Sequence, residues 1–132
     1  MSRTTSGWIA WLNRAMVVVF LVFAYVQYND PDPILWMGVY GGAAALTLIF
    51  PRASWARAFA PWLALGASLW GLALLWSGVS VGGLQAVIAG EDMSSPGVEE
   101  LREAGGLLII TGWLFCLHRL SDRDANQGDA SP

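Results

Sequence analysis

The amino-acid sequence predicts an all-α fold: an integral membrane four-helix bundle with up-down topology. Of its 132 residues, 55% are hydrophobic and only 13% are charged, whereas about a quarter of the residues in an ordinary soluble domain are charged. The apolar residues fall into four stretches, each near the length of about 20 residues with which a helix crosses a bilayer. Unpaired backbone is too costly in lipid, and no stretch alternates as a membrane β-strand does, so we expect four helices.

One transmembrane domain, residues 1–120, is expected to hold all four spans. Their expected bounds are residues 8–28, 34–50, 61–81 and 98–118. The first span is interpreted as a retained helix and not as a cleaved signal peptide, because the sequence YVQYNDPDP after its apolar core lacks a small-residue cleavage site. Residues 121–132 are polar and are expected to form a disordered cytoplasmic tail.

The distribution of arginine predicts the orientation of the spans. With four crossings, the N-terminus, the second loop and the C-terminus share one side of the membrane. That side holds Arg3, Arg14, Arg52, Arg57, Arg119 and Arg123. Only Arg102 lies on the other side. Because basic residues are enriched on the cytoplasmic side of a membrane, both termini are expected in the cytoplasm, and the expected location is the bacterial inner membrane.

The turn after the first span, QYNDPDP at residues 27–33, is the first polar motif. Asn29 tolerates the left-handed backbone that often closes a helix, and Asp32 can cap the next helix with its side chain. These turning and capping roles account for most of the residue types. They do not explain why Asp30 is acidic, nor why Gln27 lies one turn below it.

The start of the fourth span is the second polar motif. At about 100° per residue, its charged residues share one helix face with apolar residues further along. The face consists of Glu99, Arg102, Glu103, Gly106, Ile110, Trp113 and Leu117. Glu100 points elsewhere. An ionisable residue near the membrane core is costly unless it is paired, so this face is expected to turn inward and Arg102 to pair with carboxylates.

Both motifs are expected on the outer side of the membrane, because one ends the first span and the other begins the fourth. A compact four-helix bundle would bring them within reach of each other. The polar pocket predicted in this way is formed by Gln27, Asn29, Asp30, Asp32, Glu99, Arg102 and Glu103.

The two motifs together resemble those of the transmembrane family 220 proteins. The resemblance runs from about residue 13 to residue 118 and rests on Q-x-N-D-P-D, then Trp36 and Tyr40, and finally E-x-x-R-E-x-x-G-L at the start of the last helix. The matching residues are Gln27, Asn29, Asp30, Pro31, Asp32, Trp36, Glu99, Arg102, Glu103 and Gly106. The resemblance implies a small four-helix membrane protein and implies no particular reaction.

Two kinds of function stay open at this point. In the first, the protein is structural or accessory, and Arg102 with the acidic residues forms a lock between helices at the outer face. Partner membrane proteins would then dock on helix faces, for which the small-residue spacings Gly38–Gly42 and Gly78–Gly82 are weak candidates. In the second, the polar pocket binds a hard cation, a lipid headgroup or a small polar solute.

Other classes of function are disfavoured by what the sequence contains. A carboxylate pair could do acid–base work, but no nucleophile or metal triad accompanies it, so a non-enzymatic role is favoured. Cys116 and His118 are each the single residue of their type, and they cannot form a soft-metal cage by themselves. The net charge of −3 offers no basic surface for nucleic acid. The lipid bilayer is the expected partner. The sequence identifies no particular cofactor, and a metal in the polar pocket stays open.

Overall fold

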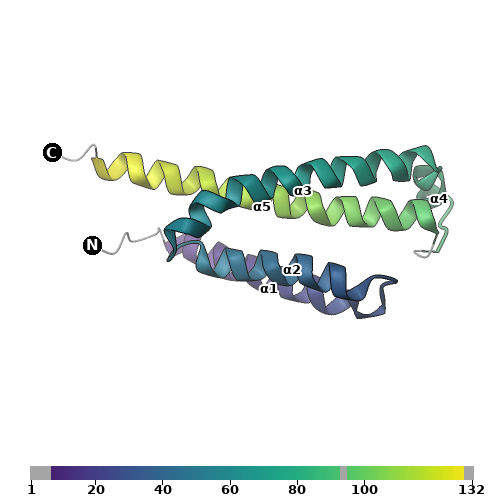
Figure 1. Cartoon of the computed structure of the whole chain (residues 1–132), viewed down its shortest axis with the longest axis horizontal. Helices are drawn as coiled ribbons and strands as arrows, with labels where there is room; N and C mark the ends of the chain where they lie inside the picture. The colour runs from purple at the N-terminus through teal and green to yellow at the C-terminus, as the bar shows by residue number, and fades with distance from the viewer. Residues whose placement is uncertain (1–6, 93–94, 130–132) are drawn as a thin grey trace. The chain divides into compact units, whose positions relative to one another are not determined.

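The computed structural model describes residues 7–92 and 95–129, and over these residues the chain is helical and contains no strand (Figure 1). The elements are α1 (Gly7–Val26), a short 3-10 turn η1 (Gln27–Asn29), α2 (Pro33–Ile49), α3 (Ser54–Ser80), α4 (Gly83–Ile88) and α5 (Pro96–Asp129). The prediction of an all-α protein is therefore confirmed for the described part of the chain.

The chain divides into two compact units, which are described separately below. The first holds the described residues up to Phe59 together with those from Asp122 onward, and the second holds Ala60–Ser121. The first unit thus contains α1, η1 and α2. The second contains most of α3, all of α4 and most of α5.

In the first unit, α1 and α2 lie side by side and run in opposite directions (Figure 1). Near one end, the side-chain amide of Asn13 donates a hydrogen bond to the backbone carbonyl of Thr47 over 3.0 Å. Near the other end, the rings of Phe23 and Tyr40 meet edge to face with centroids 5.4 Å apart. Phe20 is completely buried, so aromatic packing and one polar contact join the two helices.

In the second unit, small residues of α3 let α5 approach closely. Gly71 and Gly78 lie seven residues apart on the face of α3 that meets α5. A Cβ atom on Gly71 would lie 3.2 Å from Cβ of Leu107, and one on Gly78 would lie 3.0 Å from Cγ of Leu101. Close backbone approach of this kind is typical of helix pairs in membranes. Of the expected seat for a partner helix at Gly78–Gly82, Gly78 is therefore occupied within the chain itself, whereas a Cβ atom on Gly82 would meet only Oε1 of Gln85, at 3.9 Å.

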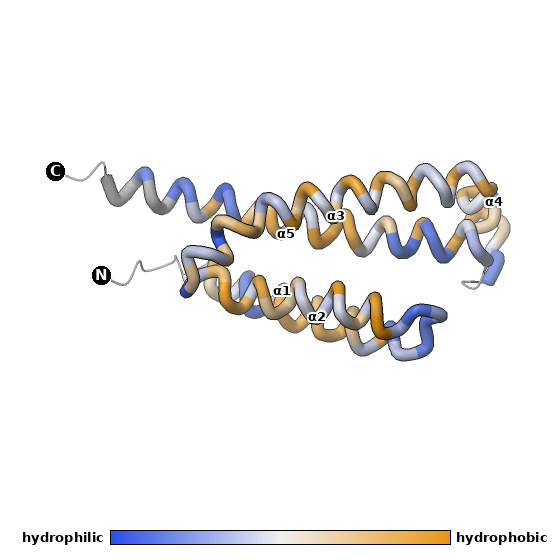
Figure 2. Tube along the Cα trace, in the orientation of Figure 1, coloured by the Kyte–Doolittle hydropathy of each residue, from blue (hydrophilic) through white to orange (hydrophobic). Residues whose placement is uncertain are grey.

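Three of the described helical segments are long and apolar enough to cross a membrane, namely Gly7–Asn29, Ser54–Ser80 and Pro96–Arg123. The segment Pro33–Ile49 is also apolar, but it has only 17 residues. Figure 2 shows apolar residues along most of α1, α2 and α3, and polar residues at the turn between α1 and α2 and near both ends of α5. These helices thus have the apolar composition of membrane spans, and many of their apolar side chains are not covered by other parts of the protein.

Two helix bounds, the start of α3 and the end of α5, differ clearly from those expected from the sequence. The third helix begins at Ser54, and Pro61 lies inside it, whereas the span was expected to begin at that proline. Pro61 has no N–H to bond to the carbonyl of Arg57, so α3 lacks one backbone hydrogen bond at this point but continues through it. At the other end of the chain, α5 continues through the polar segment that was expected to be disordered and ends at Asp129. Residues 130–132 of that segment lie outside the described residues.

Candidate functional site

The turn between α1 and α2 is held by hydrogen bonds of its own. The backbone N–H of Asp30 donates to the carbonyl of Gln27 over 2.9 Å. The backbone N–H of Asp32 donates to Oδ1 of Asp30 over 3.4 Å. The Asp30 side chain therefore acts as the acceptor of an Asx-type turn. An asparagine could make the same bond, so the turn uses the oxygen of Asp30 and does not need its charge.

Two expectations about this turn are wrong. Asn29 does not close the helix in a left-handed conformation, because no non-glycine residue in the described chain has a positive φ. Instead, α1 tightens into the 3-10 turn and the backbone becomes extended at Asp30, with φ −72° and ψ 153°. Asp32 does precede α2, and Pro33 is its first residue, but the Asp32 side chain makes no capping hydrogen bond.

Burial separates the four turn residues into two kinds. Gln27 is buried, with 9% of its surface exposed, and Asp30 is half-buried. Asn29 and Asp32 are exposed. Asp30 is thus the one carboxylate of this turn that is partly withdrawn from solvent.

On α5, the inward-facing stripe expected from the sequence is confirmed by burial. Gly106, Ile110, Trp113 and Leu117 are buried. The charged residues that continue this stripe toward the start of the helix, Glu99, Arg102 and Glu103, are half-buried. The helix face therefore changes from apolar and buried to charged and half-buried as it nears its first turn.

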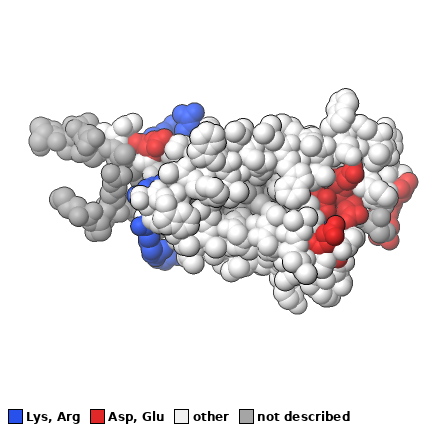
Figure 3. All heavy atoms as spheres, viewed as in Figure 1, with Lys and Arg blue, Asp and Glu red and all other residues white. Residues whose placement is uncertain are grey.

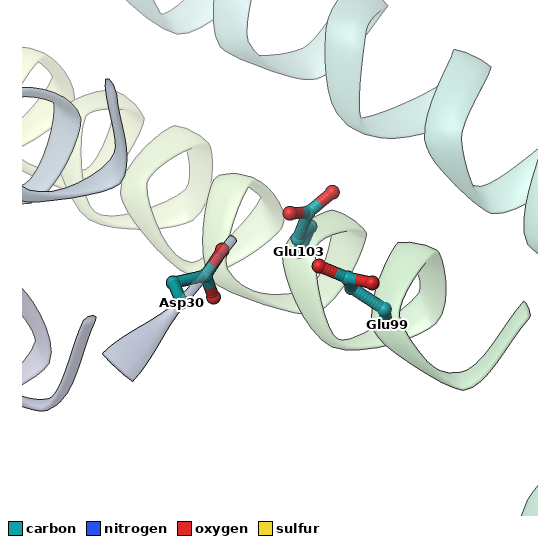
Figure 4. Close-up of side chains that lie close together, drawn as sticks. All are labelled: Asp30, Glu99 and Glu103. Atoms are coloured by element: carbon teal, nitrogen blue, oxygen red, sulfur yellow. The ribbon is translucent and has the colours of Figure 1, made fainter. Parts of the chain in front are cut away.

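Glu99 and Glu103 form a carboxylate pair on successive turns of α5 (Figure 4). One carboxylate oxygen of each residue lies within 4.8 Å of the other. At that separation two negative charges repel each other by about 3 kcal/mol if the effective dielectric constant is near 20. A positive charge close to the pair would relieve this repulsion. Arg102 lies between them in the sequence, and both Arg102 and Glu103 have interaction partners.

The charges of the second unit are unevenly distributed along it. Glu91 and Asp92 follow α4 and are exposed, and the three glutamates of α5 lie within its first eight residues. Figure 3 shows acidic side chains gathered at this end of the molecule. Arg119, near the other end of the unit, lies 5.0 Å from the ring centroid of Phe115.

The seven residues expected to form a polar pocket fall into two groups. Gln27, Asn29, Asp30 and Asp32 belong to one turn of the first unit. Glu99, Arg102 and Glu103 belong to one face of α5 in the second unit. The carboxylates offer oxygen ligands, which are the kind that hard cations such as Ca²⁺ and Mg²⁺ prefer.

Two polar residues of structural interest did not stand out in the sequence. Asn13 is only 7% exposed, and its Oδ1 atom is buried without a hydrogen-bond partner among the described residues. Oε2 of Glu100 is in the same state, although the residue as a whole is half-buried. The signal that could have indicated Asn13 is simply an amide inside an apolar span, which is rare enough to call for an explanation.

Comparisons with known proteins agree with the sequence resemblance. The family model described as "Transmembrane family 220, helix" matches residues 19–119. A protein of the frog Xenopus laevis named "Transmembrane protein 220" is 32% identical to the chain over 103 residues, covering 78% of this chain and 54% of the relative. The chain thus spans about half the length of that relative. No solved structure matches the chain. The region matched by the family model contains both polar motifs, the last part of α1, all of α2, α3 and α4, and α5 as far as Arg119. The chain therefore belongs to transmembrane family 220 as an integral membrane protein.

Proposed function

We propose that this protein is a structural or accessory multi-pass membrane protein whose outer-face polar residues lock its helices together. The observation that carries the proposal is the half-burial of Arg102 between two half-buried carboxylates at the start of α5. Charges in such a position are costly unless they are paired and hydrogen-bonded. A lock of this kind gives each charge a partner and fixes how neighbouring helices meet.

The lock requires four crossings in an up-down bundle, with α1, α2, α3 and α5 as the spans. The shortest of these spans is α2, whose 17 residues are about 26 Å long at 1.5 Å per residue. Observed transmembrane helices begin at about 17 residues. Asp32 precedes this helix and Arg52 follows it closely, so polar residues flank the span at both ends.

Both termini are proposed to face the cytoplasm. In support, Arg52 in the turn after α2 and Arg57 in the first turn of α3 lie against backbone carbonyls at the end of α2 and in this turn. Arg52 Nη1 donates to the carbonyl of Leu48 over 2.9 Å, and Arg57 Nη1 lies 3.4 Å from the carbonyl oxygens of both Phe50 and Pro51. Such an arginine-rich turn fits the cytoplasmic side. Arg3, which was counted on the same side, lies outside the described residues.

The bacterial inner membrane stays a prediction. The relative from Xenopus laevis is a eukaryotic protein, so membership of the family does not by itself indicate a bacterial membrane.

With this topology, the end of α1 and the start of α5 face the same side of the membrane. Asp30 and Asp32 would then lie on the side that holds Arg102, Glu99 and Glu103. We propose that Asp30 joins the α5 cluster, because it is the half-buried carboxylate of the turn and its hydrogen bond to the Asp32 N–H requires its oxygen but not its charge.

The lock is tested by neutralising its charges one at a time. Arg102→Gln should lower the unfolding free energy by about 1–3 kcal/mol, because it leaves half-buried carboxylates without their positive partner. Glu91→Gln and Asp92→Asn are matched controls, since both residues are exposed acids at the same end of the second unit. They should change stability by no more than about 0.5 kcal/mol. Thermal unfolding in nanodiscs provides the measurement, and equal effects of Arg102→Gln and the controls would contradict the lock.

A second candidate function is the binding of a hard cation by the carboxylates. The specific observation in its favour is the Glu99–Glu103 pair, whose oxygens lie within 4.8 Å of each other. If the carboxylates bind such a cation, millimolar Ca²⁺ or Mg²⁺ should raise the melting temperature of the protein. Glu99→Gln should abolish that rise, whereas the control Glu91→Gln should retain it. An equal response of all three proteins would show that the ions act on the surface charge alone.

A partner membrane protein is proposed to dock on α2 if the role is accessory. Gly38 and Gly42 form a small-residue spacing on this helix, and a Cβ atom on either would meet nothing within 4 Å. Small residues allow close helix approach in membranes. Gly42→Leu should therefore remove a co-purifying partner and leave the stability of the isolated protein unchanged. Retention of the partner would exclude this face as the docking site.

A further inference from the structure

The short helix α4, between α3 and α5, presents one small and buried face to the rest of its unit. Gly83 and Ala86 are both buried. A Cβ atom on Gly97 would lie 2.7 Å from Cα of Gly83, so the two backbones are in direct contact. No side chain fits at this crossing without a backbone shift. The first turn of α4 is therefore held against the first turn of α5.

A second face of α4 is apolar and exposed. Leu84, Val87 and Ile88 have 51%, 50% and 79% of their surface exposed, respectively. At about 100° per residue they fall within an arc of roughly 100°. Three large aliphatic side chains on one exposed face of a short helix would be unfavourable in water. Burying such a side chain fully is worth about 1.5–3 kcal/mol of transfer free energy relative to leaving it exposed.

A third face of α4 is the one suited to water. Gln85 and Ala89 are exposed and lie roughly 120° from both the buried face and the apolar face. Immediately afterwards, Gly90 turns the chain with a φ of +72°, and Glu91 and Asp92 follow as exposed acids. The helix thus has three separate faces, directed at protein, at apolar surroundings and at water.

The apolar face of α4 continues the exposed apolar surface of α3. Trp76, Val79 and Val81 are all exposed near the end of α3. Only Val81 and Gly82 separate the two helices, and the left-handed Gly82, with φ +83°, redirects the chain between them. Tryptophan is enriched where a span reaches the membrane surface. The lipid that covers the end of α3 is therefore expected to cover the apolar face of α4 as well.

We infer that α4 is an interfacial helix that lies along the membrane surface at the end of α3, on the side that is the outer one if the proposed topology holds. Its apolar face enters the boundary between headgroups and acyl chains, while Gln85 and the acids after it remain in water. Because Gly83 contacts Gly97, α5 holds α4 at the depth of its own first turn. Glu103 lies six residues after Gly97, which is about 9 Å along the helix. The Glu99–Glu103 pair thus lies close to the membrane boundary.

The inference is tested by measuring the depth of spin labels on α4 in nanodiscs. Single cysteines for the nitroxide are placed at Val87 or Ile88 on the apolar face, and at Gln85 or Ala89 on the water face, in a Cys116→Ala background. For each label, the ratio of its accessibility to oxygen over its accessibility to a water-soluble nickel complex is measured. This ratio should be several times higher at Val87 and Ile88 than at Gln85 and Ala89. Equal preference for the nickel complex at all four positions would overturn the inference. Labels at Val87 and Ile88 that neither reagent reaches would overturn it too, because a protein would then cover this face.

A variant of the glycine contact tests whether α5 holds α4 in place. Gly83→Leu cannot keep the backbone contact with Gly97, so the labels at Val87 and Ile88 should lose their preference for oxygen. A label at Phe115, which is exposed in the apolar part of α5, serves as the control and should keep it. If the α4 labels keep their preference in Gly83→Leu, the contact does not set the depth of the helix. Loss of the preference at Phe115 as well would mean that α5 has left the membrane, which would also overturn the contact's role.

Discussion

At the scale of single residues, the polar side chains inside or beside apolar helices carry the account. Asn13 is buried, with one half of its amide bonded to the Thr47 carbonyl and the other half unbonded among the described residues. Interhelical hydrogen bonds in membranes are worth about 0.6 kcal/mol on average. An unsatisfied buried acceptor costs about 1–3 kcal/mol. The amide therefore costs about as much as it contributes, or more.

The balance at Asn13 predicts an unusual effect of substitution. Asn13→Leu removes one bonded donor and one unbonded acceptor, so the melting temperature should stay unchanged or rise. Asn13→Asp retains the buried oxygens, adds a charge and loses the donor, so it should destabilise the protein by more than about 2 kcal/mol. Thermal unfolding of both variants in the same detergent is the measurement. A clear loss of stability in Asn13→Leu would show that Oδ1 has a stabilising partner in the membrane.

Asp30 gives a second prediction at this scale, because its oxygen and its charge have separate roles. Asp30→Asn keeps an acceptor for the Asp32 N–H, whereas Asp30→Ala removes it and should cost a further 0.5–1.5 kcal/mol, roughly the worth of one hydrogen bond. The difference in unfolding free energy between the two variants measures the turn contribution alone. If the two variants are equally stable, the 3.4 Å contact contributes nothing.

The residues of the turn also show what sequence reasoning could and could not predict. Composition and spacing indicated a turn there, with Pro33 as the first residue of α2, and the structure agrees. The conformation of Asn29 and the capping role of Asp32 were predicted wrongly. Residue preferences describe what a side chain tolerates, whereas the choice between a 3-10 turn and a left-handed cap depends on how the following helix packs.

At the scale of helices, small residues decide which pairs approach closely. The seam between α3 and α5 uses Gly71 and Gly78, while Gly66 on the same helix meets nothing within 4 Å. The difference between these glycines is invisible in the sequence, since spacing alone made Gly78–Gly82 look like a seat for a partner. Helix existence followed from length and hydropathy, but the start of α3 did not, because a proline can stand at the first turn or inside a helix.

The glycine seam makes a prediction with a control on the same helix. Gly78→Ala should destabilise the protein by about 1–3 kcal/mol, because its Cβ would lie 3.0 Å from Cγ of Leu101 and 3.1 Å from the Gly97 carbonyl oxygen. Gly66→Ala has free space and a better helix former, so it should be neutral or stabilising by up to about 1 kcal/mol. Equal changes in melting temperature for the two variants would show that the α3–α5 contact is not tight in the membrane.

At the scale of the whole molecule, the account depends on how often the chain crosses the membrane. Three described helices have the length and apolarity of spans, and α2 has the apolarity at 17 residues. The sequence predicted four apolar spans, and the described residues contain three apolar helices of span length and one shorter apolar helix. Family membership confirms an integral membrane protein. The number of crossings and the orientation are properties of the protein in a bilayer, so they follow from the positions of charges and need a direct test.

Labelling of single cysteines from each side of the membrane tests the crossings. In a Cys116→Ala background, Asp32→Cys and Asp92→Cys should react with an impermeant maleimide added outside. Arg52→Cys and Arg123→Cys should react only after the membrane is made permeable. All four positions are exposed in the structure, so each should be reachable. Reaction of Arg52→Cys from outside would mean that α2 does not cross.

The central claim is that the turn after α1 and the start of α5 meet at the outer face, and chemical cross-linking tests it most directly. With Cys116 replaced by alanine, the pair Asp30→Cys and Glu103→Cys should form an intramolecular cross-link with a short bifunctional maleimide in intact membranes. The pair Asp30→Cys and Arg123→Cys, placed on opposite sides by the proposed topology, should not. If both cysteines of the first pair react with a monofunctional maleimide yet never cross-link within one chain, the two polar groups do not meet and the outer-face lock is wrong.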